Sequence, residues 1–201
     1  MSIKGQILEN SLFADFIHKI IKEYSPQNIV EIGTWRGLGS TKRIIDAITN
    51  NNLDSNFISL ETNKVFYDEA KQNLKEYTDH VNLIYGRIIE IIDVKNFVLS
   101  QELNYQEQSW LHADIADFAV APNVLSSIPE EIDFLLLDGG EFSTYPEWLK
   151  LKDRSKIIAL DDTNTTKCRK IKQEILSENN SFYEIIIDSN DRNGFLIAVK
   201  N

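Results

Sequence analysis

The feature that most constrains this chain is a short apolar segment, residues 28–32, followed at once by three closely spaced glycines. The glycines stand at positions 33, 37 and 39, and an acid, Glu31, lies two residues before the first of them. An apolar strand that turns through glycines into a helix is typical of nucleotide binding, because glycine admits a ligand close to the backbone and a helix N-terminus offers unpaired N–H groups. Dinucleotide sites use G-x-G-x-x-G, so the spacing found here disfavours an NAD-linked oxidoreductase.

Apolar runs and helical periodicities alternate along the rest of the chain. Strands are predicted at about residues 28–33, 57–61, 81–85, 132–138, 157–161, 182–188 and 194–200, and helices at about 12–24, 38–49, 65–77 and 164–178. The first five strands are apolar enough to be buried on both faces, which favours a parallel sheet. The last two are close enough in sequence to form an antiparallel hairpin. The pattern predicts an α/β fold.

The length of 201 residues fits one domain, residues 1–201, with a sizeable core. The predicted strands at 81–85 and 132–138 are separated by much more than a short crossover. We therefore expect an insertion at about 93–131 that contains one or two short helices. Such a segment at the edge of a sheet either shapes an acceptor pocket or packs as an extra helix on the sheet.

Composition limits the kinds of partner. The formal net charge is −10 and the pI is about 4.8, which argues against nucleic acid and anionic membranes, since both require a basic surface. Cys168 is the only cysteine, so an internal disulfide is excluded. Residues 1–6 carry no apolar leader segment. We expect a soluble cytoplasmic protein that acts on a small molecule.

Acidic residues end several of the predicted strands, namely Glu31, Glu61, Asp138 and the pair Asp161 and Asp162. The carboxyl ends of parallel strands meet at one edge, where ligands of such sheets bind, so these acids should converge. Three neighbouring aspartates favour an oxygen-loving divalent cation. The alternative is that Asp162 only caps the helix that follows. Basic residues in that helix, at positions 167, 169, 170 and 172, are expected on its solvated face, and the alternative is that they attract an anionic acceptor such as a sugar nucleotide.

The turn with the pattern E-x-G-x-x-x-G-x-G resembles motif I of the class I S-adenosylmethionine (SAM) dependent methyltransferases. The resemblance implies a Rossmann-like, mostly parallel seven-stranded sheet with a terminal antiparallel hairpin and helices on both faces. It also implies that Glu61 binds the SAM ribose, that Thr62 lies beside the adenine, and that Gly86 and Arg87 lie near the adenine. The turn would wrap the amino-acid end of SAM with Glu31, Gly33, Thr34, Trp35, Gly37 and Ser40.

The pair of motifs at Asp138 and at Asp161-Asp162 resembles the metal-dependent O-methyltransferases. The catechol and caffeoyl-CoA type has Asp-Asn at the second motif, whereas the macrolide-sugar and aminocoumarin-sugar type has Asp-Asp, as here. The resemblance implies Mg²⁺ bound by Asp138, Asp161 and Asp162. In the first type the base is a lysine three positions after the first aspartate, and in the second an aspartate two positions after it. Glu141 and Gly140 occupy these places, so Glu141 is the candidate base, with Asp138 beside it.

These motifs predict a SAM-dependent O-methyltransferase, Mg²⁺-assisted, that acts on a hydroxyl of a small molecule or sugar. A metal-independent methyltransferase of the same fold would attack N or O with Asp138 or Glu141 as base. A catalytically silent SAM-fold binding protein is the third reading. The sequence leaves open whether the protein forms a homo-oligomer.

Overall fold

A seven-stranded sheet forms the centre of the computed structural model, which describes residues 7–99, 101–177 and 181–201. The strands are β1 (Asn28–Ile32), β2 (Asn56–Glu61), β3 (Asn82–Tyr85), β4 (Ile132–Leu137), β5 (Ser155–Asp161), β6 (Tyr183–Ser189) and β7 (Phe195–Lys200). Their order in the sheet is β3-β2-β1-β4-β5-β7-β6. The first five strands pair in parallel, and β7 runs antiparallel to both β5 and β6. The predicted parallel sheet with a terminal antiparallel pair is confirmed.

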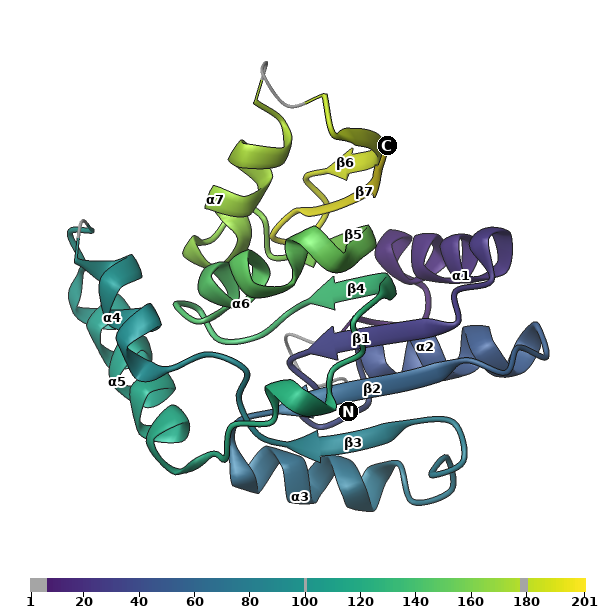
Figure 1. The fold of residues 1–201 in the computed structure, drawn as a ribbon, viewed down its shortest axis with the longest axis horizontal. Helices are drawn as coiled ribbons and strands as arrows, with labels where there is room; N and C mark the ends of the chain where they lie inside the picture. The colour runs from purple at the N-terminus through teal and green to yellow at the C-terminus, as the bar shows by residue number, and fades with distance from the viewer. Residues whose placement is uncertain (1–6, 100, 178–180) are drawn as a thin grey trace.

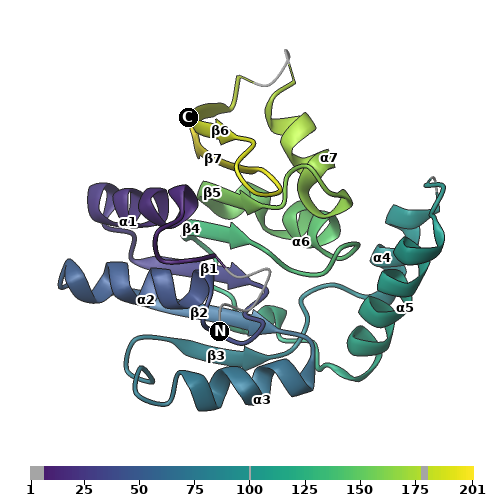
Figure 2. The ribbon, with the colours of Figure 1, turned by 180° about the vertical axis from the view of Figure 1, so that it is seen from behind.

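Helices cover both faces of the sheet, as predicted. They are α1 (Leu12–Tyr24), α2 (Ser40–Asn50), α3 (Lys64–Asn73), α4 (Ile91–Val98), α5 (Tyr105–Val120), α6 (Thr144–Leu151) and α7 (Thr166–Ile175). Figure 2 shows α1 and α2 side by side on one face. There Phe13 and Ile44 pack with Phe134 in one buried cluster, whereas Trp148 and Ile171, from α6 and α7, belong to the cluster on the other face.

Local signals explain where several of these helices begin and end. The Ser11 hydroxyl accepts a hydrogen bond from the Ala14 N–H and caps α1, and Ser25 ends that helix in the left-handed conformation. Helix α2 begins two residues later than predicted, because the glycine turn extends to Gly39. Helix α7 ends at Ile175, and the predicted end near residue 178 falls outside the described residues.

The predicted insertion contains two helices, α4 and α5, of 8 and 16 residues. A reciprocal pair of hydrogen bonds between Asn104 and Glu107 starts α5. The carboxyl ends of β1 and β4 point toward this helix pair (Figure 1). The insertion is therefore placed at the edge of the sheet where the strand-ending acids lie. In the described part of the chain, no helix is long and apolar enough to cross a membrane.

Candidate functional site

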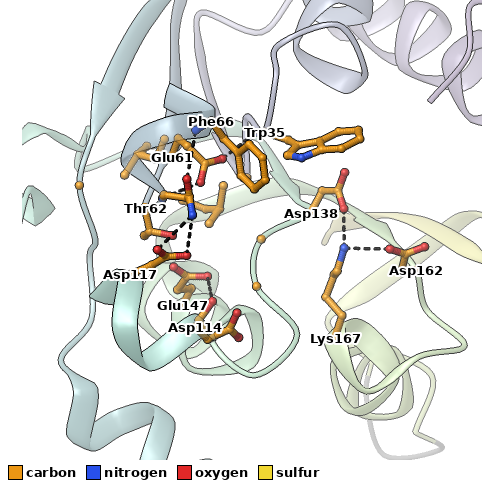
Figure 3. Close-up of a pocket in the computed structure, with 18 residues that line it drawn as sticks. Trp35, Glu61, Thr62, Phe66, Asp114, Asp117, Asp138, Glu147, Asp162 and Lys167 are labelled. Carbon is orange, nitrogen blue, oxygen red and sulfur yellow. Dashed lines mark hydrogen bonds and ion pairs between the residues drawn. The ribbon is translucent and has the colours of Figure 1, made fainter. Parts of the chain in front are cut away.

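A cavity of about 350 Å³ lies at the carboxyl edge of the sheet (Figure 3). This volume is in the range of small-molecule sites. Its wall combines the glycine turn, the ends of β2 and β4, and residues from α3, α5, α6 and α7. The lining residues are Ile32, Gly33, Trp35, Leu60, Glu61, Thr62, Asn63, Phe66, Gly86, Asp114, Asp117, Asp138, Gly139, Gly140, Ser143, Glu147, Asp162 and Lys167.

The glycine turn folds back over the ends of the neighbouring strands. The N–H groups of Gly33 and Thr34 donate to the Leu60 carbonyl oxygen at 2.9 and 3.0 Å. Gly33 has a φ of +100°, and a Cβ built on it would lie 2.2 Å from the carbonyl oxygen of Asp138. Only glycine fits there, because both the backbone conformation and the approach of β4 exclude a side chain. Gly33 is thus required to bring the turn against Asp138.

Glu61 ends β2 and binds the backbone of the turn. Its Oε2 accepts the Trp35 N–H at 2.7 Å and its Oε1 accepts the Asn63 N–H at 2.8 Å. Burial raises the pKa of Glu61 to about 7. Each carboxylate oxygen has a further lone pair, so Glu61 can also accept two hydroxyl hydrogens from a ligand. Thr62 and Gly86, which were predicted to lie near the adenine, also line the cavity.

Glu31, by contrast, lies under the turn and is fully buried. Its Oε2 accepts hydrogen bonds from the hydroxyls of Thr41 at 2.7 Å and Ser59 at 2.5 Å. Its Oε1 has no hydrogen-bond partner among the described residues. Burial raises the pKa of Glu31 to about 7. This acid joins β1 to α2 and β2, and it does not line the cavity.

Other predicted SAM-binding residues also lie outside the cavity lining. Thr34 and Ser40 are buried, and the Thr34 hydroxyl forms a hydrogen bond with that of Ser59. A Cβ on Gly37 would meet the side chain of Leu74, the residue that follows α3, at 2.6 Å, so this glycine serves packing. Arg87 donates to the carbonyl oxygens of Ile89 and Ala121 at 2.7 and 3.1 Å, which ties the segment before α4 to the end of α5.

Two acids of α5 face the cavity, and the sequence analysis did not single them out. Both Asp117 carboxylate oxygens accept hydrogen bonds from the Asn63 side-chain amide at 3.1 Å. Asp114 accepts the Phe142 N–H at 2.9 Å, and burial raises its pKa to about 6. Their spacing of three residues places both on one helical face, and this spacing is the one feature of the sequence that could have indicated them. The sequence could not show which face points to the site.

Glu147, in α6, is a third unpredicted acid of this wall. Its Oε2 accepts a hydrogen bond from the Ser143 hydroxyl at 3.2 Å. Burial, followed by the charges of Asp114 and Glu61, raises the pKa of Glu147 to about 8. The cavity therefore has a strongly acidic lining, and Lys167 is the only Lys or Arg among its lining residues. Such a lining favours a cationic ligand.

The three predicted metal ligands come together at the other end of the cavity. One carboxylate oxygen from each of Asp138, Asp161 and Asp162 lies within 4.8 Å of the others. Lys167 reaches into this group, and its Nζ lies 2.7 Å from Asp138 Oδ1 and 2.8 Å from Asp162 Oδ2 (Figure 3). Arg192 Nη1 lies 3.5 Å from Asp161 Oδ2. The expectation that Lys167 lies on a solvated helix face was wrong.

The charged groups of this cluster shift the pKa values of one another. Burial lowers the pKa of Lys167, but the charges of Asp138 and Asp162 outweigh it and keep that pKa well above its usual value. Burial and the two neighbouring carboxylates raise the pKa of Asp161 to about 7. Oxygen donors at this spacing suit a divalent cation in their chemistry. A metal ion does not fit between Asp138 and Asp162 while the Lys167 ammonium lies there.

Glu141, the predicted base, does not belong to the cavity lining. Its Oε1 accepts the backbone N–H of Lys167 at 3.2 Å, so the carboxylate caps the first turn of α7. An unpaired N–H at a helix N-terminus attracts a carboxylate, which explains this orientation. The structure therefore places Glu141 behind Lys167, whereas Asp138, the other candidate, lines the cavity.

Comparison with solved structures places the fold among methyltransferases. A candidate caffeoyl-CoA O-methyltransferase from Staphylococcus aureus aligns over 96% of this chain and 85% of its own, with a TM-score of 0.63 and 18% identity. The O-methyltransferase from Bacillus cereus, in complex with S-adenosylhomocysteine (SAH), aligns over 94% and 80%, with a TM-score of 0.59 and 17% identity. TomG from Streptomyces achromogenes, an O-methyltransferase of tomaymycin synthesis in complex with SAM, aligns over 94% and 79%, with a TM-score of 0.57 and 15% identity.

At these levels of identity, the likeness establishes the fold. The chain has the Rossmann-like fold of the class I methyltransferases, as the glycine turn predicted. No family model matches the sequence, and no curated protein matches it either.

Proposed function

We propose that this protein is a SAM-dependent methyltransferase that acts on a hydroxyl of a small molecule or sugar. The observation that carries the proposal is the glycine turn held on Glu61, at the end of β2, beside an acidic cavity. Solved structures of the same fold contain SAM or SAH, which supports this choice of ligand. The sequence-based expectation of a cytoplasmic, single-domain protein stays a prediction.

The residues of the cavity fit the parts of SAM. Glu61 would accept the ribose hydroxyls, while Thr62, Gly86 and Asp117 would flank the adenine. Gly33 and Trp35 would bind the amino-acid end. SAM carries a sulfonium and an ammonium group, and the acidic lining suits both charges. When bound, SAM supplies the methyl group to the acceptor oxygen, and the electron pair of the broken C–S bond stays on sulfur.

The acceptor hydroxyl must lose its proton as the new O–C bond forms, so a base is required. Asp138 is the proposed base, because its carboxylate lines the cavity at the end of β4, next to Gly33 of the cofactor turn. Glu141 would act indirectly, through the backbone of Lys167. The predicted Mg²⁺ stays a prediction: the spacing of the three aspartates supports it, and the position of Lys167 speaks against it.

The test is formation of SAH from SAM with a panel of phenols, diols and sugars as acceptors. We expect Asp138→Asn to retain SAH binding and to lose turnover by about 10²–10⁴-fold, the usual contribution of a general base. Asp68→Asn, on the exposed side of α3, is the matched control and should keep full activity. An Asp138→Asn enzyme within about threefold of wild type would exclude this residue as the base.

The absence of turnover has its own meaning. If the wild-type protein binds SAH but produces no SAH from SAM with any acceptor of the panel, this supports the hypothesis of a catalytically silent SAM-fold binding protein. NAD, titrated in parallel, should not bind, because the glycine spacing does not match a dinucleotide turn.

A further inference from the structure

Lys167 has an unusual place for a lysine. It lies in the first turn of α7, where the helix dipole disfavours a cation. Its side chain is only 13% exposed, and its ammonium lies between Asp138 and Asp162. A long, flexible side chain adopts one buried geometry only when its partners hold it there, so the carboxylates must provide the stabilisation.

The surroundings of Lys167 fix its backbone as well as its ammonium. The Lys167 N–H donates to Glu141 Oε1 at 3.2 Å and to the Thr165 hydroxyl oxygen at 3.3 Å. On the far side of the cluster, the Asn193 side-chain amide donates to Asp162 Oδ1 at 3.0 Å. Lys167 is thus held both at its backbone N–H and at its ammonium, which fixes the position of the ammonium. An exposed ion pair lacks such fixed contacts.

We propose that the ammonium of Lys167 takes the place of a divalent cation between Asp138 and Asp162, so that methyl transfer by this protein needs no metal. The part of this inference that concerns methyl transfer rests on the proposed function. The geometry that carries it is the pair of contacts at 2.7 and 2.8 Å, to the two aspartates that would otherwise share a metal. The third aspartate, Asp161, is paired with Arg192 at 3.5 Å.

An ammonium in this place changes what the site can hold. Lysine has three N–H donors, and Asp138 and Asp162 accept two of them. The third can donate to one acceptor oxygen, because Lys167 lines the cavity. Octahedral Mg²⁺ offers several coordination positions and can hold two vicinal oxygens. An acceptor with a single hydroxyl therefore suffices here, and a catechol or vicinal diol is not required.

Mn²⁺ binding, followed by electron paramagnetic resonance on the 201-residue protein without SAM, tests the proposal. Wild-type protein should bind Mn²⁺ no more tightly than its Asp138→Asn variant. Lys167→Ala removes the ammonium and leaves the carboxylates, so it should bind one Mn²⁺ at least tenfold more tightly than wild type. Lys170 lies about one turn further along α7, and its ammonium stacks on the ring of Tyr145. Lys170→Ala removes the same charge as Lys167→Ala and should behave as wild type.

Two results would overturn the proposal. The first is that the wild-type protein binds one Mn²⁺ and the Asp138→Asn variant does not bind it. This comparison does not depend on whether the Lys167→Ala variant folds. The second is a folded Lys167→Ala protein that binds no Mn²⁺, since the carboxylates would then not form a cation site at all. SAH binding, measured separately in EDTA, reports on the proposed function, so failure of one inference is distinguishable from failure of the other.

Discussion

At the scale of single residues, Gly33 joins the cofactor turn to the proposed base. Its N–H binds the end of β2, and its Cα lies against the carbonyl of Asp138. Two constraints act together here: the left-handed φ of +100°, and the 2.2 Å that would separate an added Cβ from the Asp138 carbonyl oxygen; either alone would strain another residue. The same glycine therefore serves the fold and the site, which makes it an informative position for substitution.

We expect Gly33→Ala to lower the free energy of unfolding by more than ~2 kcal/mol, because strain and overlap add. Gly139→Ala is the matched control: it has no positive φ, and its Cβ would meet no described atom closer than 3.1 Å, so its loss should be clearly smaller. Urea unfolding of the three proteins measures both differences. A Gly33→Ala protein within ~0.5 kcal/mol of wild type would contradict the packing described here.

At the scale of secondary-structure elements, α5 is attached to the rest of the molecule by few apolar contacts. Phe118 is its only buried residue, while Tyr105 and Val120 are strongly exposed. Yet α5 supplies Asp114 and Asp117 to the cavity. A helix with little buried surface opens locally at low free energy. Ligand contacts with these two acids should therefore stabilise α5 more than the elements of the core.

Hydrogen exchange tests this expectation. Amides of α5 should exchange faster than those of β1 and β4 in the free protein and should slow down when SAH is added. Helix α1, on the opposite face of the sheet, serves as the internal control and should not change. Slower exchange in the glycine turn with no change in α5 would show that the insertion does not contact the cofactor.

Element positions were largely predictable from sequence, and the partners of individual side chains were not. Buried parallel strands leave continuous apolar runs, so Glu61 and Asp138 could be assigned to one edge of the sheet. Lys167 could not be placed, because a lysine among other basic residues has the pattern of a solvated helix. Only the tertiary approach of α7 to β4 brings its ammonium to Asp138. The contact between Glu141 and the Lys167 backbone N–H also depends on this approach, so the sequence could not indicate it.

At the scale of the whole molecule, several buried glutamates have raised pKa values, which makes stability depend on pH. Burial raises the pKa of Glu31 and Glu61 to about 7 and that of Glu147 to about 8, from an ordinary value of 4.5. Between these values the folded protein binds more protons than the unfolded chain. Stability contributed by these groups is therefore complete below about pH 4.5 and is lost as the pH rises through 7 to 8.

We expect the melting temperature of the ligand-free protein to fall between pH 6 and pH 8.5. Glu147→Gln should lose less stability over this interval, because a neutral amide replaces one of the titrating groups. Glu23→Gln, at an exposed position of α1, should follow the wild-type curve. Thermal melts across the interval measure this, and a melting temperature that rises toward pH 8.5 would show that the buried carboxyl groups are not protonated in the folded protein.

The most direct test of the central claim is calorimetric titration of SAH into the wild-type protein and into Glu61→Ala. We predict one SAH per chain with a Kd on the order of micromolar, and a loss of ~1–3 kcal/mol of binding free energy in Glu61→Ala, because the ribose hydroxyls lose their acceptor. Glu69→Ala, which removes only a half-exposed partner of Arg36, should bind as wild type does. A wild-type protein that does not bind SAH, or a folded Glu61→Ala variant that binds it equally well, would contradict the account.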